Sequence, residues 1–182
     1  IPLRLVGSEM CIRDRCSPSR AAFMTGRNPA EINVHTRISD PQENERLANA
    51  NWLDPELPNI AKSLKENGYA TGHFGKWHLV SYQLWKKGVA PTPADYGFDS
   101  YRTRGGGVSD GFEDYPSLRE DPFFWSKSTR LFADDALSFI KECQSEGKPF
   151  YVNLWTLVPH GPLNPSQEEL NEYNGLSVSA ED

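Results

Sequence analysis

Apolar residues repeat at helical spacing between residues 128 and 147 and predict one amphipathic helix. The apolar face comprises Phe132, Ala136, Phe139, Ile140 and Cys143. The opposite, polar face comprises Asp134, Asp135, Lys141 and Glu142, which we expect to be solvated. Such a stripe is typical of a helix packed on a core. The helix should end at Gly147, because Pro149 cannot continue it.

A nearly continuous apolar segment follows the helix, from residue 150 to residue 158. It is rich in aromatic and β-branched residues and lacks the alternation of a strand with one solvated face. We therefore expect a central parallel strand that is covered on both faces. The segment Pro159-His160-Gly161-Pro162 comes directly after it.

A shorter helix and strand precede this pair in the chain. Residues 60–65 favour an amphipathic helix that starts near Pro58 and ends at Gly68. Residues 69–74 then predict a strand, and residues 75–79 predict the turn that leaves it. Helix, glycine, strand and polar turn together make half of an α/β unit.

The remaining segments show no sustained period. Residues 28–57 are polar with scattered Asn and Pro, which predicts surface loops, and Glu43, Glu45 and Arg46 predict a solvated face. Residues 80–127 form a long segment that is rich in Gly, Pro and aromatic residues. A loop of this length inside a compact domain is usually functional or disordered.

The two helix–strand units predict an α/β fold in which helices flank a mostly parallel sheet. In each unit, polar residues follow the carboxyl end of the strand, which is where open α/β sheets place their ligand sites. We therefore expect Lys76, His78 and His160 to converge at one edge of the sheet.

The most distinctive chemistry of the chain lies around Cys16. Ser17 predicts a helix N-cap and Pro18 the first helical position, so Cys16 should lie just outside a helix. The positive end of the helix dipole and the guanidinium of Arg20, about one turn away, favour an anion at Cys16. Gly26 should end this helix.

Composition narrows the class of protein. The chain has 182 residues and a net charge of −6, which suits one domain with its own core. A nucleic-acid surface is excluded, because no cluster of Lys and Arg could neutralise several phosphates. No apolar run reaches the length of about 18 residues that would span a membrane. The cysteines are Cys11, Cys16 and Cys143, too few for a disulfide framework.

Three motifs occur in a fixed order. The first is Cys16-x-Pro18-Ser19-Arg20 followed by Thr25-Gly26-Arg27, the second is the segment 68–78, and the third is Pro159-His160-x-Pro162. Together they resemble the type I, formylglycine-dependent sulfatases, and the arylsulfatases in particular. The resemblance spans residue 16 to about residue 173. It implies an alkaline-phosphatase-like α/β sandwich, of which this chain would be an incomplete part.

The resemblance implies a role for each of five residues. Cys16, oxidised after translation to formylglycine (3-oxoalanine), would be the nucleophile. Arg20 would hold its charged hydrate, and His78 would contact its hydroxyl. Lys76 would bind the sulfate group, and His160 would bind it too or assist the leaving group.

The resemblance also implies Ca²⁺ as a cofactor, with the formylglycine at residue 16 as one ligand. Family members supply further ligands from an Asp-Asp pair before the cysteine motif and an Asp-Asn or similar pair after the His-x-Pro segment. This chain has neither pair at those positions. We therefore expect the other ligands to lie outside the chain, and the isolated chain to show little or no turnover.

Residues 1–15 do not predict a signal peptide, because they lack a sustained apolar segment and a small-residue cleavage site. They end in the charged residues 13–15, where family members usually have an apolar strand and a short loop. We therefore expect residues 1–15 to be a non-native leader and residues 16–182 to be a partial sulfatase catalytic domain. The resemblance implies a periplasmic or extracellular location and a formylglycine-generating or equivalent maturation enzyme as a partner.

The implied activity is hydrolysis of a sulfate monoester on a sulfated small molecule or glycan. Two alternatives remain open. One is a phosphonate or phosphate monoester hydrolase of the same superfamily. The other is a non-catalytic remnant that binds sulfated glycans through aromatic side chains, with Trp85, Tyr96, Tyr101 and Trp125 as candidates. We expect His73 and His35 to be structural.

Overall fold

A parallel sheet of three strands, in the order β2-β1-β3, is the centre of the fold. The computed structural model describes residues 16–103, 124–159 and 165–174. The strands are β1 (Ala70–Gly75), β2 (Ser100–Thr103) and β3 (Phe150–Trp155). Both neighbours of β1 run parallel to it, and the register places Gly75 beside Thr103 on one side and beside Trp155 on the other.

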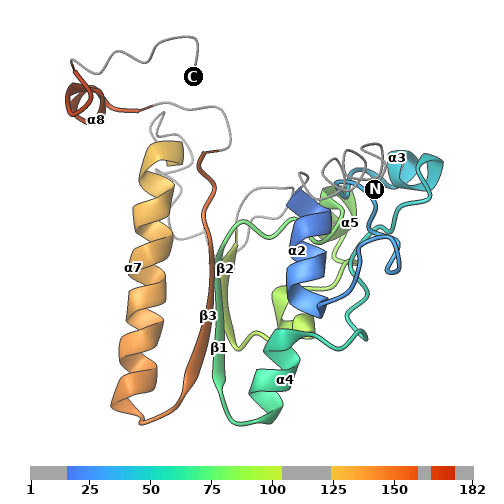
Figure 1. The fold of residues 1–182 in the computed structure, drawn as a ribbon, viewed down its shortest axis with the longest axis horizontal. Helices are drawn as coiled ribbons and strands as arrows, with labels where there is room; N and C mark the ends of the chain where they lie inside the picture. The colour runs from blue at the N-terminus through green and yellow to red at the C-terminus, as the bar shows by residue number, and fades with distance from the viewer. Residues whose placement is uncertain (1–15, 104–123, 160–164, 175–182) are drawn as a thin grey trace, which may run out of the picture.

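Helices cover both faces of this sheet (Figure 1). Helix α7 (Phe124–Ser145) lies on one face, and helices α2 (Cys16–Thr25) and α4 (Ile60–Glu66) lie on the other. The arrangement confirms the predicted α/β class. It also places the start of α2 near the carboxyl end of β1, the end that precedes Lys76.

The prediction that residues 150–158 form the central strand is wrong for the described part of the sheet. The central strand there is β1, and β3 pairs only with β1. Leu154 of β3 is 41% exposed, whereas β1 is buried from Thr71 to Gly75. The apolar sequence of β3 is compatible with packing on both of its faces. Its position in the sheet depends on its pairing partners, which are distant in the sequence.

Helix α7 packs through the apolar stripe that the sequence predicts. Four residues of the stripe are buried in one hydrophobic cluster with Phe74 of β1: Phe132, Ala136, Phe139 and Cys143. Gly147 follows the helix with a φ of 66°. The prediction that Asp135 is solvated is wrong, because its carboxylate pairs with Arg102 of β2 at 2.9 Å. Burial raises the pKa of this carboxyl above its usual value.

Helix α4 lies within one residue of its predicted limits. Its N-cap is Asn59, whose side chain accepts the N–H of Lys62 at 3.0 Å, so Pro58 precedes the helix rather than lying in its first turn. Gly68, with a φ of 83°, allows the chain to turn into β1.

Helix α2 differs from its prediction at the start. Cys16 is the first described residue of the helix rather than a residue outside it, and Ser17 is not the cap. The Ser17 hydroxyl is buried and accepts the N–H of Ile38 at 3.0 Å. The end agrees with the prediction, because Gly26 follows the helix with a φ of 67°.

The prediction that residues 28–57 are surface loops is right for most of the backbone, which has little regular structure, but wrong for part of its burial. Val34, Ile38 and Leu53 are buried in the same core as Ala21 and Met24 of α2. An apolar residue that occurs singly among polar ones gives no periodic signal, so this contribution to the core is invisible to pattern analysis.

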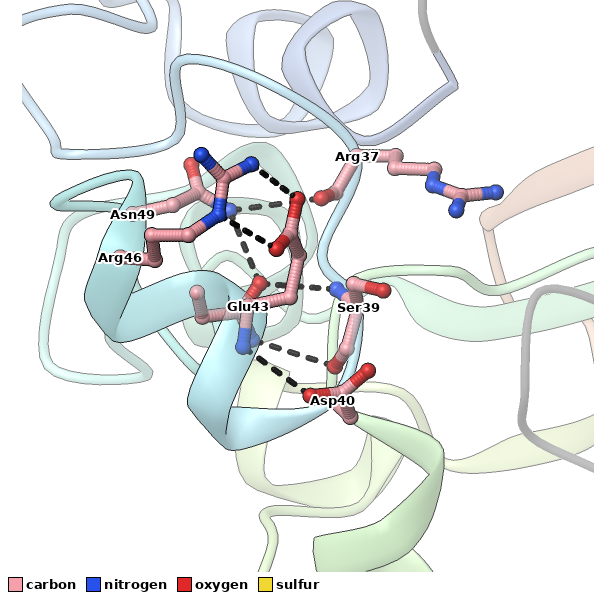
Figure 2. Close-up of polar contacts among 7 residues, drawn as sticks. Arg37, Ser39, Asp40, Glu43, Arg46 and Asn49 are labelled. Atoms are coloured by element: carbon pink, nitrogen blue, oxygen red, sulfur yellow. Dashed lines mark hydrogen bonds and ion pairs between the residues drawn. The ribbon is translucent and has the colours of Figure 1, made fainter.

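The same segment contains a short helix, α3 (Pro41–Arg46), capped by Asp40 (Figure 2). The predicted solvated face is confirmed there. The guanidinium of Arg46 donates two hydrogen bonds to the carboxylate of Glu43, at 2.7 and 2.8 Å, on the exposed side of the helix.

Three short elements complete the described chain: α5 (Tyr82–Lys86), the 3₁₀ helix η1 (Pro93–Tyr96) and α8 (Gln167–Asn171). Tyr96 is fully buried and its hydroxyl donates to the carbonyl oxygen of Leu53 at 2.6 Å, so it is a core residue and not a glycan contact. Residues 104–123 of the long aromatic segment lie outside the described residues. Of the helices described, none combines the length and the apolar character that crossing a membrane requires.

His73 of β1 is part of the aromatic core, which confirms the prediction that it is structural. It is fully buried, and its Nδ1 accepts a hydrogen bond from the amide of Asn153 on β3 at 3.2 Å. Its neighbours are the rings of Trp77, Phe98 and Trp155. Burial, followed by the nearby charge of Arg20, lowers the pKa of His73 to about 3.

We predict that Gly75→Ala destabilises the protein far more than Gly147→Ala. Both glycines have positive φ values, 116° and 66°, but a Cβ at residue 75 would overlap the carbonyl oxygen of Trp155, whereas a Cβ at residue 147 meets nothing within 4 Å. Gly147→Ala should lower the free energy of unfolding by about 1 kcal/mol, and Gly75→Ala by at least about 3 kcal/mol. Urea unfolding measures both, and equal losses would contradict the described β1–β3 approach.

We also predict that the protein loses stability as the pH falls below about 6.5. The pKa of His73 is lower in the folded than in the unfolded state, so the unfolded state takes up the proton first and folding weakens as the pH falls toward about 3. In that window this residue should cost up to about 1.4 kcal/mol per pH unit. Urea unfolding at several pH values measures the loss of stability. An NMR titration that gave His73 an ordinary pKa would show that this residue is not the cause of the loss.

Candidate active site

The side chains of Cys16 and Lys76 meet although they are distant in the sequence. Cys16 lies at the start of α2, and Lys76 is the first residue after β1. The ammonium Nζ of Lys76 lies 3.1 Å from Sγ of Cys16. Lys76 is only 6% exposed, so its charge lies in a partly desolvated place where it acts more strongly than it would in water.

The backbone of Lys76 is held from two directions. Its N–H donates to the carbonyl oxygen of Trp155 at 2.6 Å, which extends the β1–β3 pairing by one residue. Its carbonyl oxygen accepts a hydrogen bond from the guanidinium of Arg20 at 2.9 Å. The two bonds fix Lys76 between α2 and β3.

Arg20 lies one turn along α2 from Cys16 and brings a second positive charge to the same place. Its guanidinium stacks over the ring of Trp155, with 4.4 Å between its central carbon and the ring centroid. Burial lowers the pKa of Arg20 to about 10, and the nearby thiol group of Cys16 opposes that shift. Arg20 therefore stays charged at neutral pH. Its Nε is buried without a hydrogen-bond partner among the described residues.

His78 is a neutral imidazole at physiological pH. Burial is the main cause and the charge of Lys76 the second, and together they lower the pKa of His78 to about 4. Nε2 of its ring lies 3.2 Å from the carbonyl oxygen of Ile38. The backbone of His78 has a φ of 55°, in the left-handed region that residues with a β-carbon rarely adopt.

The structure therefore brings together part of the predicted site. Cys16, Arg20 and Lys76 contact one another directly or through one backbone group, and His78 lies near enough to Lys76 to lose basicity. His160, the remaining predicted site residue, lies outside the described residues. Its expected convergence with Lys76 and His78 stays a prediction.

Two residues of this site escape sequence reasoning. Trp155 supports Arg20 with its ring and Lys76 with its carbonyl oxygen, but in the sequence it is one of several aromatic residues in an apolar segment. Ile38 contacts Ser17 and His78 through its backbone, and a backbone contact leaves no mark on residue type. Only the strand register and the path of residues 28–57 could have revealed them.

The described residues around Cys16 do not by themselves fit a calcium ion. Calcium takes six to eight oxygen ligands, whereas this place presents a thiol, an ammonium and a guanidinium. Across the described part of the chain, no three His, Cys, Asp or Glu side chains are grouped closely enough to hold a metal ion. The two cations suit an anion instead.

Comparison with known proteins shows the family of the chain. The Sulfatase family matches the chain over residues 9–179. The arylsulfatase of Hemicentrotus pulcherrimus is 33% identical over 177 residues, which cover 84% of this chain and 30% of the relative. The N-acetylgalactosamine-6-sulfatase of Mus musculus is 30% identical over 186 residues, which cover 85% of this chain and 32% of the relative. The chain thus spans about a third of the length of these relatives.

Solved structures show the same fold. The crystal structure of Ps i-CgsB matches with a TM-score of 0.65 at 25% identity and covers 90% of this chain and 39% of the other. PsFucS1 sulfatase from Pseudoalteromonas sp. matches with a TM-score of 0.53 at 18% identity and covers 85% of this chain and 36% of the other, a likeness that concerns the fold alone. With the family match extending over most of its length, the chain belongs to the sulfatase family.

Proposed function

We propose that the full-length protein hydrolyses sulfate monoesters with a formylglycine at residue 16 as its nucleophile. The observation that carries the proposal is the contact of 3.1 Å between Lys76 Nζ and Cys16 Sγ, beside the guanidinium of Arg20. Sγ marks the place that the oxygens of a hydrated formylglycine would take. A nucleophile with two cationic side chains nearby suits an attack on a sulfate group, whose oxygens carry the negative charge.

The proposed reaction has two steps. In the first, one hydroxyl of the hydrated aldehyde attacks the sulfur atom, the bond from sulfur to the ester oxygen breaks, and the alcohol leaves with a proton. In the second, the other hydroxyl loses its proton, the bond between residue 16 and the sulfate breaks, and free sulfate leaves. The aldehyde forms again and takes up water. Splitting the hydrolysis in this way replaces one difficult step by two easier ones.

Each nearby side chain has a proposed part in this reaction. Lys76 and Arg20 stabilise the sulfate oxygens and the hydrate, because both present N–H donors in a partly desolvated place and Arg20 stays charged there. His78 is neutral and can accept a proton or a hydrogen bond from a hydroxyl at residue 16. His160 assists at the sulfate group or the leaving group, as the family resemblance implies. Ca²⁺, with most of its ligands outside this chain, would supply further positive charge when bound.

The relatives support a proposal for the substrate class. An arylsulfatase and an N-acetylgalactosamine-6-sulfatase are among those that match most of the chain. We therefore propose an aryl sulfate or a sulfated glycan as the substrate, and a formylglycine-generating or equivalent enzyme as the maturation partner. We further propose that the protein acts outside the cytoplasm.

We predict that Cys16 is converted to formylglycine when the full-length protein is produced together with a formylglycine-generating enzyme. The residue lies in the complete Cys-x-Pro-Ser-Arg motif. Mass spectrometry of the peptide that carries residue 16 should show an aldehyde that reacts with a hydrazide probe, and Cys16→Ala should abolish the signal. An unmodified thiol in the coexpressed protein would favour the non-catalytic remnant.

We also predict that Lys76→Ala lowers kcat/KM for an aryl sulfate by about 100- to 1000-fold, because it removes a fixed charge from the sulfate oxygens. The matched control is Lys86→Ala, which removes a lysine that stacks on the ring of Tyr82, in α5. Sulfate release by the matured, full-length protein measures the effect. Equal rates for Lys76→Ala and the parent would refute the role of Lys76.

The same assay separates the rival enzyme class. An aryl phosphonate and an aryl phosphate are offered in parallel with the aryl sulfate. A higher kcat/KM for either phosphorus ester would identify the protein as a phosphonate or phosphate monoester hydrolase that uses the same nucleophile.

A further inference from the structure

A buried asparagine of α3 holds the backbone of the segment beside the active site. Asn44 is 0% exposed. Its Oδ1 accepts the N–H of Ser39 at 2.9 Å, and its Nδ2 donates to the carbonyl oxygen of Ser39 at 3.1 Å. Nδ2 also donates to Oδ1 of Asn51 at 2.9 Å. One amide group therefore binds both backbone groups of Ser39 and fixes the orientation of that residue.

A second asparagine anchors the other end of the same segment. Oδ1 of Asn49 accepts the N–H groups of His35 and Thr36, at 2.8 and 3.3 Å. Figure 2 shows Ser39 and Asn49 in one set of polar contacts, with the side chain of Arg37 extending away from it. Residues 35–39 are thus held at both ends, and little freedom remains for the residue before Ser39.

That residue, Ile38, is the link to the active site. Its N–H donates to the hydroxyl of Ser17, the neighbour of Cys16, at 3.0 Å. Its carbonyl oxygen lies 3.2 Å from Nε2 of His78. Ile38 is only 3% exposed, so neither backbone group has ready access to water as an alternative partner.

The contact between Ile38 and His78 determines which ring nitrogen carries the proton. A carbonyl oxygen can only accept a hydrogen bond, so Nε2 of the neutral ring must be the donor. Nδ1 then has a free lone pair. It is buried and has no hydrogen-bond partner among the described residues.

We propose that Asn44 is a positioning residue for His78: by clamping Ser39, it holds the carbonyl oxygen of Ile38 on Nε2–H and so keeps Nδ1 as the acceptor toward residue 16. The direction of that acceptor rests on the proposed function. The tautomer and its dependence on Asn44 do not, because they follow from contacts that are present with an unmodified cysteine.

The experiment reads the tautomer of His78 directly. The chain is labelled with ¹⁵N-histidine, and the couplings of each ring nitrogen to the ring carbon protons are recorded by NMR at neutral pH. His78→Asn assigns the signals. The parent should show the Nε2–H tautomer. Asn44→Ala should lower the ratio of Nε2–H to Nδ1–H about fivefold, the effect of weakening one hydrogen bond.

The matched control is Asn59→Ala. Asn59 is also buried, 4% exposed, and its side chain also accepts a backbone N–H, that of Lys62 in α4. It makes no contact with residues 35–39 among its described hydrogen bonds. Asn59→Ala should therefore destabilise the chain by a similar amount and leave the tautomer ratio of His78 unchanged.

The outcomes are separate from those of the activity assay. An Nδ1–H tautomer in the parent overturns the proposal without any variant, and so does an unchanged ratio in a folded Asn44→Ala. If Asn44→Ala does not fold, Ser17→Ala serves in its place, because it removes the hydroxyl that accepts the N–H of Ile38. This variant should shift the tautomer ratio of His78 in the same direction. An unchanged ratio in Ser17→Ala would refute the proposal. Failure to release sulfate with the predicted tautomer intact would count against the proposed function alone.

Discussion

The structure around Cys16 depends on the close approach of β1 and β3 at their carboxyl ends. Because residue 75 has no side chain, the backbone at that point can lie against the carbonyl oxygen of Trp155. The next residue, Lys76, then donates its N–H to that oxygen, and its own carbonyl receives Arg20. One backbone contact between two strands therefore sets the position of both cations beside the sulfur.

Those cations are tolerated because each has compensating contacts. The guanidinium of Arg20 lies on an aromatic face and donates to a backbone oxygen, so it remains charged although burial lowers its pKa. The ammonium of Lys76 has the sulfur as its neighbour. Two positive charges in one partly buried place repel each other, and a bound anion would relieve that repulsion. The charges of the site therefore favour an anion, on physical grounds that do not depend on the family match.

Much of the fold could be predicted from the sequence, because its elements have strong local signals. The stripe of α7 and the glycines that end α2 and α4 mark their elements with little error. The order of the strands could not be predicted in the same way. The apolar segment of β3 is compatible with a central or an outer position, and the choice depends on long-range pairing. Single buried residues such as Val34 and Leu53 could not be predicted for a related reason, since they belong to no repeat.

Within the site, residue types pointed to Cys16, Arg20 and Lys76. Trp155 and Ile38 could not be predicted, because they act through a ring face or a backbone group that the residue type does not reveal.

The left-handed backbone at His78 limits how this position can change over evolutionary time. A β-branched or bulky residue is strongly disfavoured at a φ of 55°, and glycine, asparagine and aspartate tolerate it best. Of these, only asparagine combines a neutral donor with a neutral acceptor, as the imidazole does. Asparagine is therefore the replacement that keeps both the backbone conformation and the hydrogen-bonding capacity of this position at the lowest cost.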